Sequence, residues 1–224
     1  MNDVAALETF CRNHGASLFG TCSISHLKDT FLLNPGELEG LTHAISIGVR
    51  LSRAVLNGIE DSPTLLYKWH YRQANVQLDK IAFLLSLKLQ ELGFLALPIA
   101  ASQTVDWQKQ AGHLSHKRVA IEAGLGWLGR NNLVVNQEFG SQFRLVTVLT
   151  NMPLKQPEQQ PFRCGDCYRC LAACPAKALG ETPEQYQFQK CFQLLSHFCK
   201  NKNLGLYICG ICVKACPGKL SNAD

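Results

Sequence analysis

Four regularly spaced cysteines stand in the stretch CGDCYRCLAACP, residues 164–175. Cys164, Cys167, Cys170 and Cys174 follow the pattern C-x2-C-x2-C-x3-C-P, a spacing by which thiolates hold iron–sulfur clusters. Three thiolates two residues apart on a tight loop can each reach one iron of a cubane face. The fourth thiolate comes after a helical turn and cannot close the same cube, so the spacing predicts that it binds a second cluster.

A second, shorter cysteine pattern, CGICVKACP, supplies Cys209, Cys212 and Cys216. It lacks one thiolate, and either Cys191 or Cys199 must complete it. Four cysteines from the first pattern, three from the second and one from the segment between them give eight thiolates, enough for two 4Fe–4S cubanes. In a crossed arrangement, the last cysteine of each pattern binds the cluster held by the other pattern. This arrangement predicts one set of Cys164, Cys167, Cys170 and Cys216, and another of Cys174, Cys209, Cys212 and the completing cysteine.

Two other uses of cysteine compete with this interpretation. C-x2-C pairs also build structural zinc sites, and crowded cysteines form disulfides in secreted proteins. Zinc sites rarely use three cysteines at C-x2-C-x2-C followed by Cys-Pro, and no histidine stands at ligand spacing within the two patterns. Nine of the 11 cysteines fall between Cys164 and Cys216, and in a cytosolic chain such crowding indicates metal binding before disulfides.

The composition is that of a folded globular protein. Of the 224 residues, 46% are hydrophobic and 17% are charged, which supports a packed core and argues against disorder. The net charge is +5, but the lysines and arginines are scattered, so a nucleic-acid partner is not indicated. No apolar span of 18 residues occurs and MNDVAALETF does not resemble a signal peptide, so we expect a cytoplasmic location and no membrane partner.

Helices and strands mix along the first 150 residues, which predicts an α+β fold class. Apolar periodicity and capping residues predict helices over 3–14, 75–92 and 115–123. Short β-prone runs predict strands over 43–52, 94–100, 133–136 and 143–150, the last two in one sheet. The sequence TPEQ at 182–185 predicts a helix over 183–199. The stretch 153–162, rich in Pro and Gln, is the expected linker, so we divide the chain into a cofactor domain, 1–155, and a cysteine module, 156–224.

The stretch GLGWLG, residues 124–129, matches the pattern G-x-G-x-x-G, which in dinucleotide-binding proteins follows a strand and opens a helix. Here the preceding KRVAIEA has a helical pattern and the following RNNLVVN has that of a turn and strand. The acidic residue that the motif needs about 20 positions further on is also missing, because Glu138 comes too early and Glu158 lies beyond the next strand. These glycines are therefore not expected to bind a dinucleotide.

The same stretch carries a family resemblance. The motif AGLGW-x-G-(K/R)-n-x-L, a glycine near a hairpin at Gly140, the motif LT-x-x-PL at 149–154 and the two cysteine patterns resemble the epoxyqueuosine reductases and their relatives, which include the reductive dehalogenases. The similarity covers most of the chain. In that family a single cysteine in the helical region between the patterns completes the cluster ligands, and Cys191 resembles it better than Cys199 does.

The resemblance implies a nitroreductase-like N-terminal domain, related to cobalamin-processing proteins, followed by a ferredoxin-like module with two 4Fe–4S clusters. It also implies a bound cobalamin whose cobalt is reduced through the clusters and then reduces a substrate. In that case Gly124, Gly126 and Gly129 let the backbone approach the corrin closely, and Trp127 forms an aromatic wall. The alternatives are a tight helix-to-strand turn for the glycines and core packing for Trp127.

The sequence departs from the epoxyqueuosine reductases where their proton donor is expected. Their D-x-A-P motif has no counterpart in DWQKQAGHLSHKR, and the helical-repeat region that could hold tRNA is missing, which argues against queuosine synthesis. The candidates for a catalytic proton donor are Asp106, His113, His116 and Tyr71. The two histidines are also candidates for a lower cobalt ligand or a zinc pair, and the alternative is that they are ordinary polar residues at a helix start.

Two functions follow from these observations. The first is a reductase whose two clusters feed electrons to a corrinoid for the reduction of a small-molecule substrate. The second is an electron carrier or activator for a partner corrinoid protein, with no substrate of its own. Both need an electron donor such as a ferredoxin or flavodoxin. The sequence assigns neither the substrate nor the oligomeric state.

Overall fold

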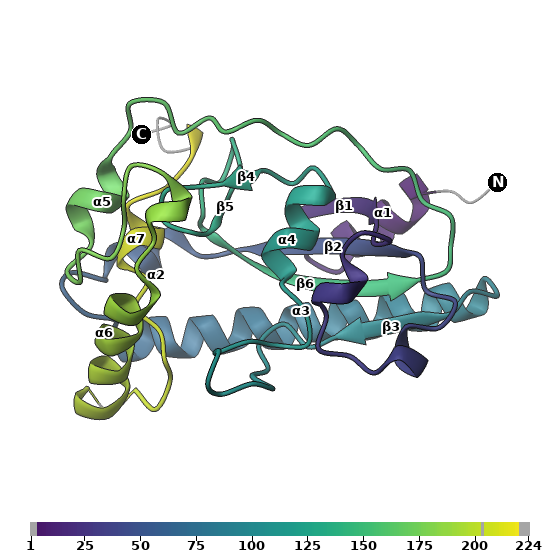
Figure 1. Ribbon diagram of the computed structural model, residues 1–224, viewed down its shortest axis with the longest axis horizontal. Coiled ribbons are helices and arrows are strands. Elements are labelled where there is room, and N and C mark those ends of the chain that lie inside the picture. The colour runs from purple at the N-terminus through teal and green to yellow at the C-terminus, as the bar shows by residue number, and fades with distance from the viewer. Residues whose placement is uncertain (1–3, 203, 220–224) are drawn as a thin grey trace. The chain divides into compact units, whose positions relative to one another are not determined.

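The structure is a computed structural model that describes residues 4–202 and 204–219 (Figure 1). The chain forms two compact units, each built from three separate segments. The sheet unit comprises Met1–Val49, Ala74–Leu125 and Arg144–Gln160, and the cysteine unit comprises Arg50–Gln73, Gly126–Phe143 and Pro161–Asp224. This division differs from the single cut predicted between residues 155 and 156, because two earlier segments fold together with the cysteine patterns.

A four-stranded sheet organises the sheet unit. Its strands are β1 (Leu18–Ser23), β2 (His43–Arg50), β6 (Phe143–Thr150) and β3 (Ala96–Ile99), in the order β1-β2-β6-β3. β1 and β2 pair antiparallel from Leu18↔Gly48 to Ser23↔His43, and β3 and β6 pair antiparallel from Ala96↔Thr150 to Ile99↔Thr147. The mixed α/β architecture that the sequence indicates is therefore present.

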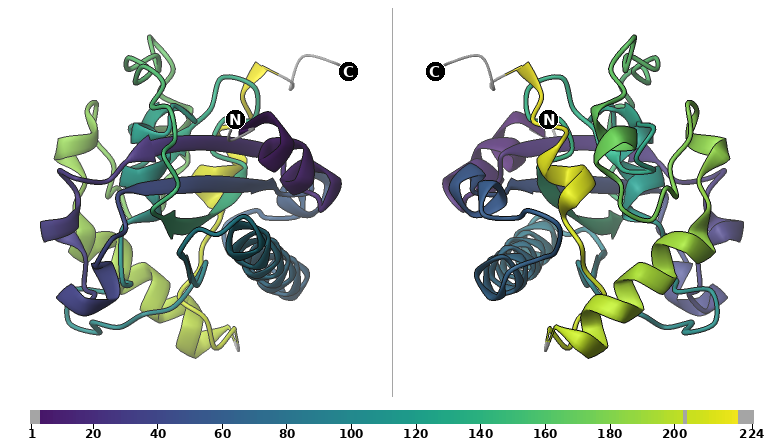
Figure 2. Two further views of the ribbon diagram at one scale, coloured as in Figure 1. Left: turned by 90° about the vertical axis from the view of Figure 1, so that its right-hand side faces the viewer. Right: turned by 90° about the vertical axis from the view of Figure 1, so that its left-hand side faces the viewer.

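Helices cover both faces of this sheet. Ile45 and Ile47 of β2 share one apolar core with residues of α1 (Val4–Asn13) and α3 (Leu65–Glu91). Because side chains alternate along a strand, Ser46 and its β1 partner Gly20 face the other way, where a side chain at Gly20 would strike the backbone of Ala123 just after α4 (His116–Glu122). Figure 2 shows α3 nearly end-on beside the strands.

The predicted helices 3–14 and 115–123 correspond to α1 and α4, and Ser115 caps α4 by accepting from the Arg118 N–H at 3.4 Å. The helix predicted over 75–92 begins earlier, at Leu65. Thr64 supplies the start that the apolar pattern did not show, because its hydroxyl oxygen accepts from the Tyr67 N–H at 3.0 Å. Glycine ends the helix as predicted, since Gly93 has a φ of +85°.

The cysteine unit contains mostly short elements. They are α2 (Arg53–Asn57), β4 (Trp127–Leu128), β5 (Val134–Val135), α5 (Arg169–Ala173), the 3-10 helix η3 (Pro183–Gln185), α6 (Phe188–Asn201) and α7 (Ile211–Lys214). α5 and α7 pack against each other, and α2 packs against α7. In Figure 2, α6 and α7 are the yellow-green and yellow helices.

Two sequence-based assignments in this region were wrong. The strand at 133–136 does not join the strand at 143–150, because β5 pairs with β4 in a separate two-stranded sheet, with Trp127 opposite Val135. The predicted helix over 183–199 is also interrupted. The capping box of Thr182 and Gln185 starts only the single turn η3, and the chain is extended at Tyr186 before α6 begins at Phe188.

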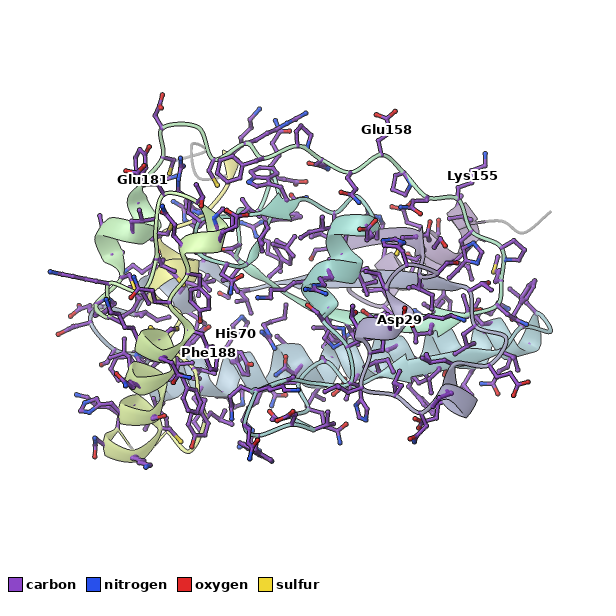
Figure 3. All side chains as sticks on the ribbon, in the orientation of Figure 1. Asp29, His70, Lys155, Glu158, Glu181 and Phe188 are labelled. Atoms are coloured by element: carbon purple, nitrogen blue, oxygen red, sulfur yellow. The ribbon has the colours of Figure 1, made fainter. Side chains whose placement is uncertain are left out.

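The expected linker runs along the sheet unit as a strap, residues 155–160. The Thr21 hydroxyl donates to the Lys155 carbonyl, and Gln156 and Gln159 donate to Glu122 at 3.2 and 2.7 Å. Figure 3 shows the charged side chains of Lys155 and Glu158 pointing away from the sheet unit. The hydrogen bonds to Thr21 and Glu122 hold residues 155–160 in place. In the described part of the chain, no helix has the length and apolar character needed to cross a membrane.

Candidate metal centre

The two cysteine patterns fold in the same local way. In each, a glycine follows the first cysteine and has a positive φ, +48° at Gly165 and +83° at Gly210, a conformation that glycine adopts without steric cost. The turn brings the Cys167 N–H to 3.0 Å from the Cys164 carbonyl. A short helix follows, α5 in the first pattern and α7 in the second, so the last cysteine of each pattern comes one helical turn later.

Three thiols of the first pattern interact with one thiol of the second. Burial raises the pKa of Cys170 to about 11, and the nearby thiols of Cys216, Cys164 and Cys167 add to the shift. Burial also raises the pKa of Cys216, to which Cys164 and Cys167 contribute. Interactions between charged groups weaken with distance, so the thiols that shift one another's pKa lie near one another. The structure therefore brings together Cys164, Cys167, Cys170 and Cys216, which we name the first thiol set.

The remaining four thiols form a second thiol set, Cys174, Cys191, Cys209 and Cys212. Burial raises the pKa of Cys209 to about 11, with further contributions from Cys191 and Cys174. Burial raises the pKa of Cys212 as well, with larger contributions from the other three members of the set and a smaller one from Cys170. These shifts group the last cysteine of each pattern with the other pattern.

Cys191 and Cys199 both lie on α6 but are eight residues apart, which is about 12 Å along a helix. Burial and Cys174 raise the pKa of Cys191, while a hydrogen bond from the Tyr186 hydroxyl lowers it. Cys191 is the one that lies with the second set.

Within residues 4–202 and 204–219, no three His, Cys, Asp or Glu side chains are close enough together to hold a single metal ion.

Trp127 and Arg130 of the glycine-rich stretch contact the first cysteine loop. The indole Nε1–H of Trp127, a residue only 6% exposed, donates to Cys164 Sγ at 3.4 Å. Arg130 is 7% exposed and donates to the carbonyls of Glu181, Gly165 and Cys167 at 2.6, 2.8 and 3.1 Å. Its guanidinium also stacks on Tyr168, 4.3 Å from the ring centroid. Figure 3 labels Glu181 beside this loop. The stretch therefore supports the candidate metal centre.

Protein atoms already occupy the space beside the three glycines of GLGWLG. A Cβ at Gly126 would lie 2.1 Å from the Val135 carbonyl oxygen, and one at Gly129 would lie 2.3 Å from Val135 Cγ2. Gly124 has a φ of +71°, and its Cβ would lie 2.8 Å from Pro157 Cγ. The turn-and-packing alternative thus accounts for all three glycines. Trp127, the predicted aromatic wall, is directed at Cys164 instead.

The candidate proton donors are mostly engaged within the protein. His116 Nε2 donates to the Ala100 carbonyl at 3.0 Å, so Nδ1 accepts from the Thr147 hydroxyl at 2.8 Å. Burial lowers the pKa of His116 to about 4, which leaves the ring neutral near pH 7. With both nitrogens bonded, His116 cannot serve as the predicted acid, cobalt ligand or half of a zinc pair.

Asp106 is engaged by its own turn, since its Oδ1 accepts from the Gln108 and Lys109 N–H groups, each at 2.9 Å. Tyr71 lies on α3 with its ring edge-on to Tyr67. His113 precedes α4, and its carbonyl accepts from the Leu32 N–H at 2.6 Å. An open cavity of about 700 Å³ in the sheet unit is lined by residues of 28–40 and by none of these candidates. The structure therefore gathers no catalytic constellation from them.

Comparison with known proteins identifies the relatives of this chain. No family model matches it. The epoxyqueuosine reductase of Lactococcus garvieae is 31% identical to it over 191 residues, which is 80% of this chain and 52% of that protein. The chain is a relative of the epoxyqueuosine reductases. This confirms the resemblance seen in the motifs, although the chain spans only about half of that relative's length.

Solved structures of the epoxyqueuosine reductases and of a dehalogenase share the fold. The epoxyqueuosine reductase from Streptococcus thermophilus superposes with a TM-score of 0.67 at 22% identity, covering 97% of this chain and 66% of that one. A reductive dehalogenase, studied for its B12-dependent dehalogenation, superposes with a TM-score of 0.62 at 16% identity, covering 79% of this chain and 25% of that one. These likenesses place the chain in a fold common to both enzyme groups.

Proposed function

We propose that this protein is an iron–sulfur redox protein that holds two 4Fe–4S clusters, one in each thiol set. The observation that carries the proposal is the sorting of eight cysteines into two sets of four, each drawing its last member from the other pattern. An all-sulfur donor set suits iron–sulfur clusters. Their chemistry, when bound, is the storage and transfer of single electrons.

The surroundings of the thiols fit bound iron–sulfur clusters. Thiolates of a bound cluster carry negative charge, and N–H donors stabilise such sulfur atoms. Trp127 donates to Cys164, and the Arg169 Nε–H donates to Cys167 Sγ at 3.5 Å. The Arg169 hydrogen bond is the largest cause of a lowered pKa at Cys167, and Arg130 also contributes. These donors favour the thiolate at Cys167, whereas burial raises the pKa of Cys170 in the same loop.

The electrons are proposed to reach a corrinoid and then a small-molecule substrate. This step rests on the relationship to epoxyqueuosine reductases and to a reductive dehalogenase studied for its B12-dependent reaction. The glycines of GLGWLG do not fit as the corrin contact, because protein atoms fill the space beside them. The second candidate function, an electron carrier for a partner corrinoid protein, gains support from that packing. A ferredoxin or flavodoxin remains the proposed donor, and the cytoplasm the proposed location.

Iron counting tests the two thiol sets. The full chain, reconstituted anaerobically with iron and sulfide, should bind about eight irons, and Cys191→Ala should lose about four of them. Cys199→Ala is the matched control on the same helix and should keep all eight. Iron and acid-labile sulfide are measured per chain, with EPR of the reduced protein. If Cys199→Ala lost the iron and Cys191→Ala kept it, the second set would be assigned wrongly. A single zinc per set would overturn the cluster proposal itself.

A further inference from the structure

Trp127 is fixed firmly beside the first thiol set. It belongs to β4 and pairs with Val135 of β5, and its side chain is only 6% exposed. Gly126 and Gly129, on either side, allow the close packing of this strand against Val135. The indole N–H therefore reaches Cys164 Sγ, 3.4 Å away, from a position that the surrounding backbone determines.

Hydrogen bonds to sulfur tune an iron–sulfur cluster. Reduction adds negative charge to the cluster and its thiolates, and an N–H directed at a ligand sulfur stabilises the more negative state. The effect is largest where water is excluded, because a low local dielectric strengthens the interaction. A buried indole N–H is suited to this role, because indole can only donate a hydrogen bond and because burial keeps the N–H from donating to water instead.

The two thiol sets differ in the number of such donors. In the first set, Trp127 donates to Cys164 and Arg169 donates to Cys167, and the Ser141 hydroxyl hydrogen-bonds to Cys216. The Ser141 N–H donates to the Cys216 carbonyl. In the second set, among the described residues, the Tyr186 hydroxyl is the comparable side-chain donor, to Cys191, and the Ile211 N–H hydrogen-bonds to Cys209. Arg130 adds positive charge next to the first loop.

We propose that the indole N–H of Trp127 is a positioning and tuning group that raises the reduction potential of the cluster held by the first thiol set, so that this cluster accepts the first electron. The inference rests on the proposed function, because it needs a cluster in each set. It goes further in assigning an order of reduction and the residue that sets it. Trp127 is not a catalytic residue here, since it acts through Cys164.

Removal of the N–H with retention of the ring tests this role. In anaerobically reconstituted full-length protein, redox titration followed by EPR should give two midpoint potentials. Trp127→Phe should shift the higher one downward by about tenfold in the reduction equilibrium, which is about 59 mV for one electron, and leave the lower one in place. Trp107→Phe, at a tryptophan that is 65% exposed in the sheet unit, should change neither. Unchanged midpoints in a Trp127→Phe protein that holds eight irons would refute the proposal.

A second measurement needs no substitution. Wild-type protein labelled with ¹⁵N at the indole nitrogens and reduced by one electron should show ¹⁵N coupling to the EPR signal in ENDOR. No coupling would overturn the proposal even if Trp127→Phe failed to fold. A wild-type iron count well below eight would instead contradict the proposed function, so the two failures are distinguishable.

Discussion

Trp127 and Arg130 stand three residues apart in the glycine-rich stretch, and both donate to the first cysteine loop. The sequence drew attention to Trp127 as an aromatic wall, whereas its N–H turned out to be the informative group. Arg130 was part of the family motif but received no role. The available signal was an arginine directly after Gly129, together with aromatic residues around the first cysteine loop. Its hydrogen-bond partners, however, are backbone carbonyls, which no side-chain pattern reveals.

His116 shows how a histidine that is a catalytic candidate by sequence can instead have both ring nitrogens engaged in hydrogen bonds within the protein. Burial holds its pKa near 4, below the ordinary value of about 6.5. Between these values the unfolded chain binds a proton that the folded chain does not. Folded-state stability is therefore fully present above about pH 6.5 and is lost as the pH falls towards about 4.

His116→Gln removes this titration while keeping one donor and one acceptor. Between pH 7 and pH 5, the wild-type free energy of unfolding should fall by roughly 2 kcal/mol more than that of the variant. Urea unfolding at both pH values measures the difference. His197→Gln, at an exposed position on α6, is the control and should follow the wild type. An equal fall in His116→Gln would show that His116 does not remain neutral in the folded protein.

At the scale of elements, the sequence predicted best where a local signal starts and ends the element. α1 and α4 have apolar periodicity, and Gly15 and Ser115 mark an end and a start that the structure retains. β1 was not predicted, because LFGTCS is short and its central Gly20 is needed for contact with Ala123 rather than for strand formation. The pairing of β5 with β4 depends on contacts between residues, which a period-two pattern does not specify.

Gly126 determines whether β4 and β5 can pair. In Gly126→Ala the new Cβ would meet the Val135 carbonyl oxygen, a backbone atom that cannot move alone, so we expect a loss of about 2–3 kcal/mol in the free energy of unfolding. Gly36→Ala is the control, because a Cβ there meets no atom within 4 Å, and its effect should stay within about 0.5 kcal/mol. Urea denaturation measures both. Equal midpoints for the two variants would contradict the close packing of β4 on β5.

At the scale of the whole molecule, the spacing of the cysteines is itself a signal, and it is enough to predict two sets of four thiols. The extent of the cysteine unit was not predictable, since it includes residues 50–73 and 126–143 that carry no cysteine. Their membership depends on tertiary contacts, such as the hydrogen bonds from Lys214 Nζ to the carbonyls of Asn57 and Ile59. No composition shift marks these segments.

Whether the protein is an enzyme or an electron carrier is also a property of the whole molecule. If the protein is a corrinoid-dependent reductase, the reconstituted chain should retain about one cobalamin per chain through gel filtration. The visible spectrum of that cobalamin should then change when the clusters are reduced. Absorbance after separation, with cobalamin and no protein as the blank, measures retention. A protein that passes electrons to a partner and retains no corrinoid would instead favour the carrier.

The crossed membership of the thiol sets also has a consequence for biosynthesis. The first set joins Cys164 to Cys216, and the second joins Cys174 to Cys209 and Cys212. During translation, neither set has all four ligands until the second cysteine pattern has left the ribosome, by which time Trp127 and Arg130 are already available. Loading of iron is thus expected only after the chain has been synthesised through Cys216, and a chain cut short before the second pattern would have no complete cluster site.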